Sequence, residues 1–230
     1  RLVLTEAGRI ALDHADRIFS TGDELLATLA QTGLDRQVLR VGALSTLSRN
    51  FQLQFLRPVL GRPEVEVILR SGSGPVLGDA LQALALDLVL TTEPPPSETK
   101  LIAHRLDEAP VAVYGTPARL RHASLAALLA SEPVILPTES SIRTGFDALV
   151  ARLGVTPILA AEVDDMAMVR LLAREDAGLA IAPGVVFADE VASGRIARAP
   201  FDLDIVESFY ALTVPRRFPN PVLADLLPDG

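Results

Sequence analysis

The sequence predicts an α/β fold in which a long dimerisation helix is followed by two Rossmann-like βαβ lobes. Apolar residues recur at helical spacing over residues 5–31, which predicts the long helix. Short aliphatic segments then alternate with helical segments, and this alternation occurs twice along the chain. The chain has 230 residues, of which 49% are hydrophobic, so it is long enough to bury a substantial core.

The composition excludes several classes of protein and site. A net charge of −8 argues against this chain binding nucleic acid by itself, because phosphate contacts need an excess of Lys and Arg on one face. The absence of cysteine excludes disulfides, thiolate zinc sites and cysteine nucleophiles. The three histidines lie far apart and show no metal-ligand spacing. We therefore expect neither a metal nor another cofactor.

The sequence shows no signal for a membrane. No apolar run approaches the ~18 residues of a transmembrane helix. The first residues do not resemble a signal peptide, because a polar, charged helix follows them. We expect a soluble cytoplasmic protein with no membrane partner. Since the sequence lacks an initiator Met, we also expect it to be part of a longer protein.

The helix predicted over residues 5–31 carries a heptad seam. Thr5 is suited to N-cap it and Glu6 to its first turn, and Gly33 and Asp35 are expected to end it. Such a helix is about 40 Å long, more than one small core covers on all sides. The seam favours pairing with a second copy of the chain over packing on its own domain. Its residues recur at steps of four and three: Ala11, Ala15, Ile18, Gly22, Leu25 and Leu29.

The next segment is predicted to be a βαβαβ unit. Three strands joined by two helices imply a parallel sheet with right-handed crossovers. Ser45 or Thr46 is expected to N-cap the first of these helices, and three consecutive prolines after the third strand predict a loop. The expected strands are 39–43, 65–69 and 87–91, and the expected helices are 45–60 and 75–84.

A second unit of similar size follows two further strands, at 101–106 and 111–114. A late strand over 208–214 and a short apolar tail complete the chain. Two similar α/β lobes with a cleft between them are therefore expected. The strands of the second unit are predicted at 133–136, 158–163 and 178–182, and its helices at 141–153, 165–174 and 184–192.

Hydroxyl side chains occur where predicted strands end and helices begin. Any single one is best explained as a helix cap. Together, however, they converge on the same edge of both lobes, where helix N–H groups also point. This arrangement suits a small anionic or polar ligand. The residues are Ser45, Thr46, Thr91, Thr92, Thr138, Ser140 and Ser141.

Carboxylates are predicted on the second lobe's side of the same cleft, at Glu139, Asp164 and Asp165. Together with hydroxyls, they are ligands suited to a hard cation. A cap on the following helix is the favoured role for Asp164 or Asp165. No pair of carboxylates can be assigned as acid and base from spacing alone.

Enzymatic motifs are missing from the sequence. The segment 72–78 follows a strand and opens a helix, but its spacing is GxGxxxG instead of the dinucleotide-binding GxGxxG, so a plain loop is favoured. There is no phosphate-binding GxxxxGK[ST] loop and no GxSxG nucleophile motif. We therefore expect no catalytic activity. An enzyme acting on a phosphate-bearing substrate near residues 72–78 remains a weaker alternative.

Several segments resemble the LysR-type transcriptional regulators. Residues 4–8, LTEAG, resemble the "LTxAG" that ends the family's winged helix-turn-helix and begins its linker helix. Residues 39–42 resemble the first strand of its effector domain, and residues 178–183, GLAIAP, resemble its "GxAxxP" strand. Residues 210–217 resemble the strand that returns to the first subdomain. Their order and spacing cover essentially the whole chain.

The resemblance implies a type 2 periplasmic-binding-protein-like fold. Residues 1–32 would be the end of the helix-turn-helix and the linker helix, 37–108 with 210–230 lobe I, and 109–209 lobe II. An effector would bind between the lobes. Its implied contacts are Ser45, Thr46, Thr91, Thr138, Glu139, Ser140, Ser141, Asp164 and Pro183.

The implied partners follow from the same resemblance. They are DNA through the preceding domain, a small-molecule or ion effector, a second or further copies forming a homodimer or homotetramer, and RNA polymerase. Residues 15–19 and 162–167 most resemble the NhaR-like sub-group, which is ion-responsive. The expected function is the effector-sensing and oligomerising part of a regulator. The alternative is a free-standing periplasmic-type solute-binding protein, which shares the two-lobed architecture.

Overall fold

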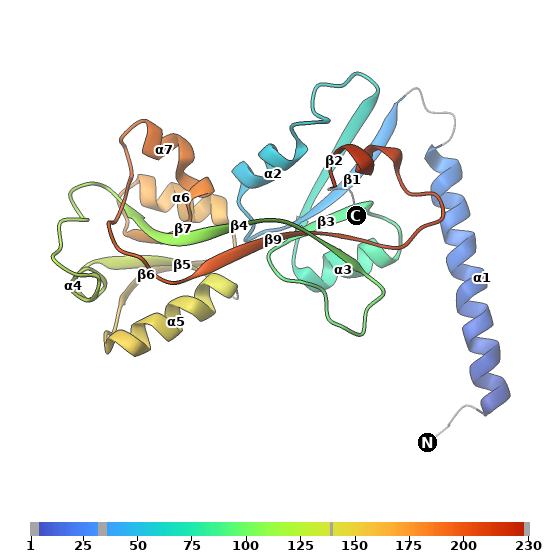
Figure 1. The fold of residues 1–230 in the computed structure, drawn as a ribbon, viewed down its shortest axis with the longest axis horizontal. Coiled ribbons are helices and arrows are strands. Elements are labelled where there is room, and N and C mark those ends of the chain that lie inside the picture. The colour runs from blue at the N-terminus through green and yellow to red at the C-terminus, as the bar shows by residue number, and fades with distance from the viewer. Residues whose placement is uncertain (1–4, 32–35, 139, 228–230) are drawn as a thin grey trace.

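The computed structural model describes residues 5–31, 36–138 and 140–227. Two α/β lobes lie end to end, and the N-terminal helix α1 stands beside the first of them (Figure 1). One mixed sheet runs through both lobes in the order β2-β1-β3-β9-β4-β7-β5-β6, with β8 paired to β4. The predicted α/β class is confirmed.

The first lobe is built on three parallel strands. Strand β1 pairs with β2 on one side and β3 on the other, both in parallel register. This is the sheet that the strand–helix–strand alternation predicted. The elements are β1 (Gln37–Leu44), α2 (Arg49–Leu56), β2 (Val65–Gly72), α3 (Gly74–Gln82) and β3 (Leu88–Thr91).

The second lobe repeats this plan. Strand β5 lies between β6 and β7, again in parallel register. Its elements are α4 (Leu125–Ser131), β5 (Pro133–Pro137), α5 (Ser141–Leu153), β6 (Ile158–Val163), α6 (Met166–Arg174), β7 (Leu179–Pro183), the 3₁₀ helix η1 (Gly184–Phe187), α7 (Ala188–Ala192) and β8 (Ala197–Arg198). Helix α4 and strand β8 were missed in the sequence, and the helix expected over 184–192 is split into η1 and α7.

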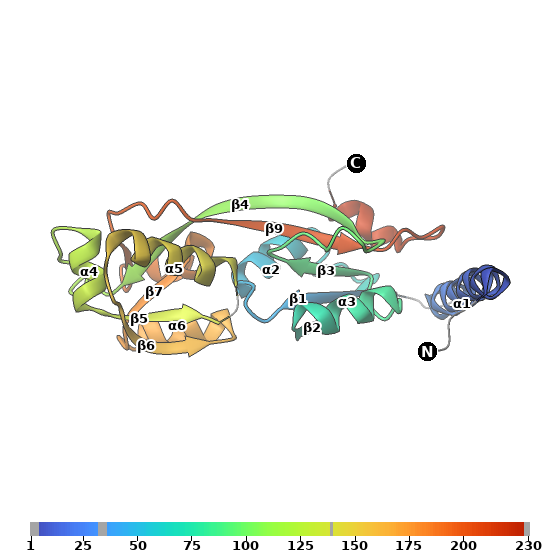
Figure 2. The same cartoon turned by 90° about the horizontal axis from the view of Figure 1, so that it is seen from below.

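Two long antiparallel strands connect the lobes, as Figure 2 shows from below. They are β4 (Ile102–Gly115) and β9 (Val206–Thr213). The sequence predicted two strands where β4 is one, because Asp107, Glu108 and Pro110 interrupt the apolar pattern. The strand instead absorbs a register shift between Arg105 and Asp107, and Pro110 is tolerated because its fixed φ suits extended backbone.

Each lobe has its own hydrophobic core. In the first lobe, Phe51 of α2 stacks on Phe209 of β9 with ring centroids 4.1 Å apart. In the second, Tyr114 stacks on Phe187 at 4.9 Å, and Phe146 is fully buried. The second core draws its buried residues from 111–205, whereas the first draws on 39–90 and 209–223. The lobe boundaries implied by the resemblance stay a prediction.

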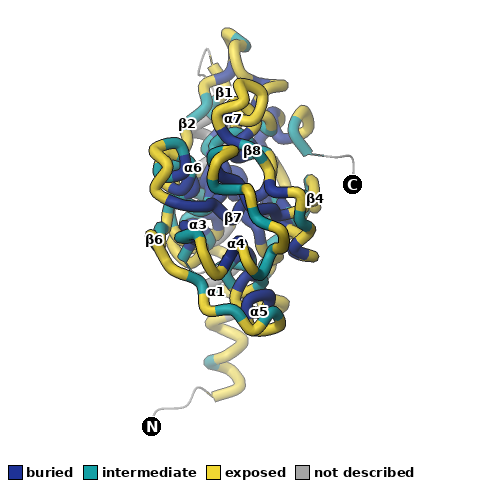
Figure 3. The backbone as a smooth tube through the Cα atoms, turned by 90° about the vertical axis from the view of Figure 1, so that its left-hand side faces the viewer, coloured by how far each residue is buried: buried dark blue, intermediate teal, exposed yellow. Residues whose placement is uncertain are grey.

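Helix α1 (Glu6–Gln31) exposes most of the apolar side chains that the structure describes in it, and Figure 3 shows its projecting part as mostly exposed. Of the predicted seam, Ala11 is exposed, Ala15 is partly buried, and Ile18 and Leu25 are 70% and 56% exposed. The side chain of Leu29 and the predicted helix end at Gly33 and Asp35 lie outside the described residues.

Two helix starts differ in how well the sequence predicted them. Ser48, and neither Ser45 nor Thr46, caps α2, since its side chain accepts from the N–H of Phe51. The residues between β1 and α2 form a turn, so the helix begins four residues later than expected. Asp165 caps α6 as favoured, by accepting from the N–H of Ala167 at 2.9 Å. After β9, Asn220 caps the 3₁₀ helix η2 (Pro221–Asp225), which the sequence did not predict.

Candidate functional site: a polar cleft between the lobes

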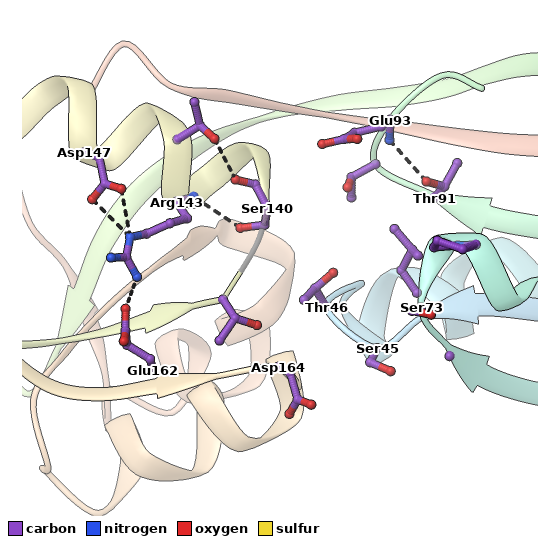
Figure 4. Close-up of a pocket in the computed structure, with 17 residues that line it drawn as sticks. Ser45, Thr46, Ser73, Thr91, Glu93, Ser140, Arg143, Asp147, Glu162 and Asp164 are labelled. Atoms are coloured by element: carbon purple, nitrogen blue, oxygen red, sulfur yellow. Dashed lines mark hydrogen bonds and ion pairs between the residues drawn. The ribbon is translucent and has the colours of Figure 1, made fainter. Parts of the chain in front are cut away.

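A cleft of about 1290 Å³ opens between the two lobes. Its walls come from the segments that follow the parallel strands of each lobe (Figure 4). Ligands of open α/β sheets bind at these carboxyl ends, because strand ends and helix starts meet there. The lining residues are Leu44, Ser45, Thr46, Gly72, Ser73, Gly74, Pro75, Thr91, Thr92, Glu93, Thr138, Ser140, Arg143, Thr144, Asp147, Glu162 and Asp164.

The first lobe supplies a wall of hydroxyl groups. The N–H of Ser45 donates to the carbonyl of Gly72 at 3.2 Å and ties the ends of β1 and β2 together. The side chain of Ser73 precedes α3 without capping it, so this hydroxyl is not engaged by the helix. Thr91 Oγ1 accepts a hydrogen bond from the N–H of Glu93 at 3.2 Å. This bond stabilises the turn that follows β3 at the cleft.

The second lobe supplies a wall of charged groups around the start of α5. Ser140 Oγ accepts from the N–H of Arg143 at 3.2 Å and so caps the helix. Arg143 Nε donates to both carboxylate oxygens of Asp147, at 3.0 and 2.9 Å, and its Nη1 donates to Glu162. The hydrogen bonds with Glu162 and then Asp147 raise the pKa of Arg143.

The lobes also touch directly beside the cleft. The carbonyl of Ser45 accepts from the N–H of Met166 at 3.4 Å. Arg49 lies 3.8 Å from Asp165, and Asn50 Nδ2 donates to the carbonyl of Val185 at 2.9 Å. The loop after β1 therefore lines the cleft and also contacts the opposite lobe.

Six of the predicted effector contacts line this cleft: Ser45, Thr46, Thr91, Thr138, Ser140 and Asp164. Ser141 and Pro183 are placed elsewhere. The Oγ of Ser141 is buried without a hydrogen-bond partner, and Pro183 is buried in β7 opposite Val111. Glu139 lies outside the described residues.

Six charged or hydroxyl residues of the lining were not proposed as contacts from the sequence: Ser73, Glu93, Arg143, Thr144, Asp147 and Glu162. The sequence predicts a plain loop around Ser73. The i,i+4 spacing of Arg143 and Asp147 on α5 was a usable signal for their ion pair. No local pattern indicated the pairing with Glu162, because Glu162 lies on strand β6 and Arg143 on helix α5.

Among the described residues, no three His, Cys, Asp or Glu side chains are grouped closely enough to hold a metal ion. No helix in the described part of the chain combines the length and apolar character needed to span a membrane.

The family model of the LysR substrate binding domain matches residues 32–227. The chain belongs to this family. It is the regulatory, effector-binding domain of LysR-type transcriptional regulators, as the opening motif and the strand motifs had indicated. The family consists of transcriptional regulators, which bind DNA and small-molecule effectors and form oligomers; it is not a family of enzymes. A free-standing solute-binding protein is not favoured.

Solved structures of LysR-type regulators share the fold. The apo regulatory domain of HypT from Salmonella typhimurium is 13% identical, with a TM-score of 0.68 over 85% of this chain and 94% of that chain. CrgA from Neisseria meningitidis is 19% identical, with a TM-score of 0.64 over 98% and 79%. The CcmR regulatory domain from Synechocystis, in complex with 2-PG, is 18% identical, with a TM-score of 0.61 over 81% and 92%.

A comparison with curated proteins gave no match. Identities of this size to the solved structures show the fold alone. The resemblance to the NhaR-like sub-group therefore stays a prediction.

Proposed function

We propose that this LysR-type domain binds a small effector in the interlobe cleft and converts the binding into a change in how the lobes are arranged. The observation that carries the proposal is the loop after β1. Its Ser45 lines the cleft and also accepts a hydrogen bond from Met166 of the opposite lobe. An effector shifts such an equilibrium only if it binds one arrangement more tightly than the other, and contacts to both walls supply that difference.

The proposed effector contacts are the six predicted residues that line the cleft. Thr91 ends β3 and Thr138 follows β5, so the two residues line the cleft from opposite lobes. Ser140 also caps α5, so its hydroxyl position is fixed before any ligand arrives. Preorganised hydroxyls reduce the entropy lost on binding. The same fold in a relative has been solved bound to 2-PG, and that of HypT bound to bromide, which supports a small ligand.

Helix α1 is proposed to pair with α1 of a second copy. Its apolar residues are exposed in the single chain, with Phe19 as well as Ile18 more than two thirds exposed. Burying a heptad seam in a coiled coil removes this surface from water. The resulting homodimer, or a tetramer built from it, would place the preceding DNA-binding domains on one operator in the cytoplasm. Contact with RNA polymerase belongs to the same proposal.

The role of the cleft in effector binding is tested by a substitution that fills it with a large side chain. Thr46→Trp places a large side chain among the lining residues, whereas Leu53→Trp makes a comparable change on the exposed face of α2. A metabolite panel is screened by the thermal shift of the parent chain. Ligands that raise the Tm of the parent and of Leu53→Trp are expected to lose at least tenfold in affinity for Thr46→Trp. Unchanged affinity in Thr46→Trp would place the binding site elsewhere.

The pairing of α1 is tested by a matched pair of substitutions. Ile18→Asp puts a charge on the seam, and Ile10→Asp puts the same charge on a described, exposed position off the seam. Sedimentation velocity is expected to show dissociation to monomers only for Ile18→Asp, because a buried unpaired carboxylate costs several kcal/mol. A parent chain that is monomeric at high concentration, or an intact Ile18→Asp dimer, contradicts pairing through α1.

A further inference from the structure

The charge of the cleft bears on which ligands it accepts, and this inference rests on the proposed function. The described lining residues include four carboxylates, Glu93, Asp147, Glu162 and Asp164, against the single guanidinium of Arg143, a net charge of −3. No lysine and no aromatic side chain is among these lining residues. A ligand therefore meets carboxylates and hydroxyls, with no ring available for stacking.

Arg143 is not free to bind an anion. Its Nε bonds to both oxygens of Asp147, and its Nη1 bonds to Glu162. An anionic ligand would have to displace one of these carboxylates and leave it unpaired beside the ligand's own charge. Both partners are about half exposed, so each pair by itself is weak, but an anion must compete with two carboxylates for this one guanidinium.

Two carboxylates remain uncommitted, one on each wall. No described side chain forms an ion pair with Glu93, which follows β3, or with Asp164, which follows β6. Both residues are exposed and line the cleft, Glu93 from the first lobe and Asp164 from the second (Figure 4). A positive group between them would be attracted to both lobes, and would favour arrangements in which the lobes approach one another.

The starts of helices α3 and α5 oppose this charge only in part. Each helix N-terminus is equivalent to about half a positive charge, so the two together offset about one of the three excess negative charges. The N–H of Arg143 is already taken by Ser140. The start of α3, which Ser73 leaves uncapped, is suited to a hydroxyl or other oxygen of the ligand.

We infer that the cleft selects a small, hydrophilic, cationic ligand, one that carries an aliphatic ammonium or guanidinium group together with hydrogen-bonding groups for the hydroxyl wall. Its positive group lies between Glu93 and Asp164. Small dianions are disfavoured at the same site. The charge of the ligand thereby couples binding to the approach of the lobes.

The test uses the 230-residue chain and three four-carbon probes that differ in charge: butane-1,4-diamine, butane-1,4-diol and succinate. The diamine is expected to raise the Tm at low ionic strength, with smaller effects for the diol and none for succinate. Glucosamine, glucose and glucuronate form a second series of the same design. Salt at about 0.5 M is expected to weaken the cationic probes but not the neutral ones, because screening lengths are then only a few ångströms.

A pair of variants locates the effect. Asp164→Asn removes one uncommitted carboxylate at the cleft, and Glu175→Gln removes an exposed carboxylate at the far end of α6. Affinity for the diamine or glucosamine is expected to fall about fivefold in Asp164→Asn, the size typical of one exposed ion pair, and to stay at the parent value in Glu175→Gln.

The outcomes separate this inference from the proposed function. Stronger stabilisation by succinate or glucuronate than by the cationic probes overturns the inference of a cationic ligand. If Thr46→Trp then abolishes that stabilisation, the cleft is still the ligand-binding site. Equal responses to all charges, no response to the cationic probes, or equal losses in Asp164→Asn and Glu175→Gln also overturn it. The proposed function fails separately, if ligands found by the metabolite screen still bind Thr46→Trp.

Discussion

The base of the first lobe and the crossover between the lobes each bury a carboxyl group, with opposite surroundings. At the base, Asp87 is 2% exposed and accepts from the N–H of Arg40 at 2.8 Å, with Arg216 and Asn220 each 3.3 Å away. At the crossover, Glu207 is also 2% exposed, but no described group lies within hydrogen-bonding distance of its Oε2.

This difference shows that burial alone does not decide what a carboxyl group contributes. Asp87 joins β3 to the segment that follows β9, because Arg216 and Asn220 both come from the C-terminal part of the chain. Glu207 lies on β9 opposite Ala109 of β4, on the strand pair that links the lobes. Without a partner, its charged form is penalised by desolvation, and burial raises the pKa of Glu207 to about 8.

The largest effect is expected at the paired site. Asp87→Ala leaves the side chain of Arg216, which is only 8% exposed, without its counter-charge, and leaves the N–H of Arg40 unsatisfied. Loss of one partner of a buried pair costs about 3–5 kcal/mol. Denaturant unfolding at pH 7 measures it. The double variant Asp87→Leu with Arg216→Met is expected to recover much of the loss, and a double variant no more stable than Asp87→Ala would contradict the pairing argument.

A pH-dependent effect is expected at the unpaired site. The unfolded chain releases the Glu207 proton near pH 4.5, whereas the folded chain holds it until about pH 8. Between these values the folded state binds more protons, so the free energy of unfolding falls as pH rises, by about 1.4 kcal/mol per pH unit. Glu207→Gln is expected to remove this slope.

The control for that prediction is Glu108→Gln, a neighbouring carboxyl on β4 that is half exposed. Unfolding free energies of all three proteins are measured between pH 5 and 8. Glu108→Gln is expected to follow the parent chain. A Glu207→Gln variant with the parent's pH dependence would show that Glu207 is ionised in the folded protein.

The smallest effect is expected for charges at the surface of the second lobe. Arg119 pairs with Glu132 and Asp176 at 2.7 Å each, but the Asp176 side chain is 50% exposed. Arg119→Ala is expected to cost about 1 kcal/mol or less at pH 7, because water and salt screen such pairs. The cost is expected to shrink in 1 M salt. A loss equal to that of Asp87→Ala would remove the distinction between buried and exposed pairing.

The sequence by itself determined the two βαβαβ units, the long amphipathic helix and the family. The two-residue period of strands and the 3.6-residue period of helices can be recognised within short segments of the sequence. In each unit, helices must cover the apolar strands. The hydroxyls at the cleft were predictable for a related reason. Parallel strands end at a common edge, so residues such as Thr91 and Thr138 gather there whatever the details of packing.

Tertiary structure decided the electrostatics of the cleft and the exact contacts. Arg143 of α5 is neutralised partly by Glu162 of β6, and the hydroxyl of Ser141 is buried although the neighbouring Ser140 lines the cleft. Tertiary structure also explains why position 178 is a glycine, because a Cβ there would lie 2.6 Å from the carbonyl oxygen of Pro133. Local patterns specify which faces are apolar and where strands end. The distance between groups far apart in the chain depends on how the elements pack against one another. That distance determines whether a buried charge has a partner.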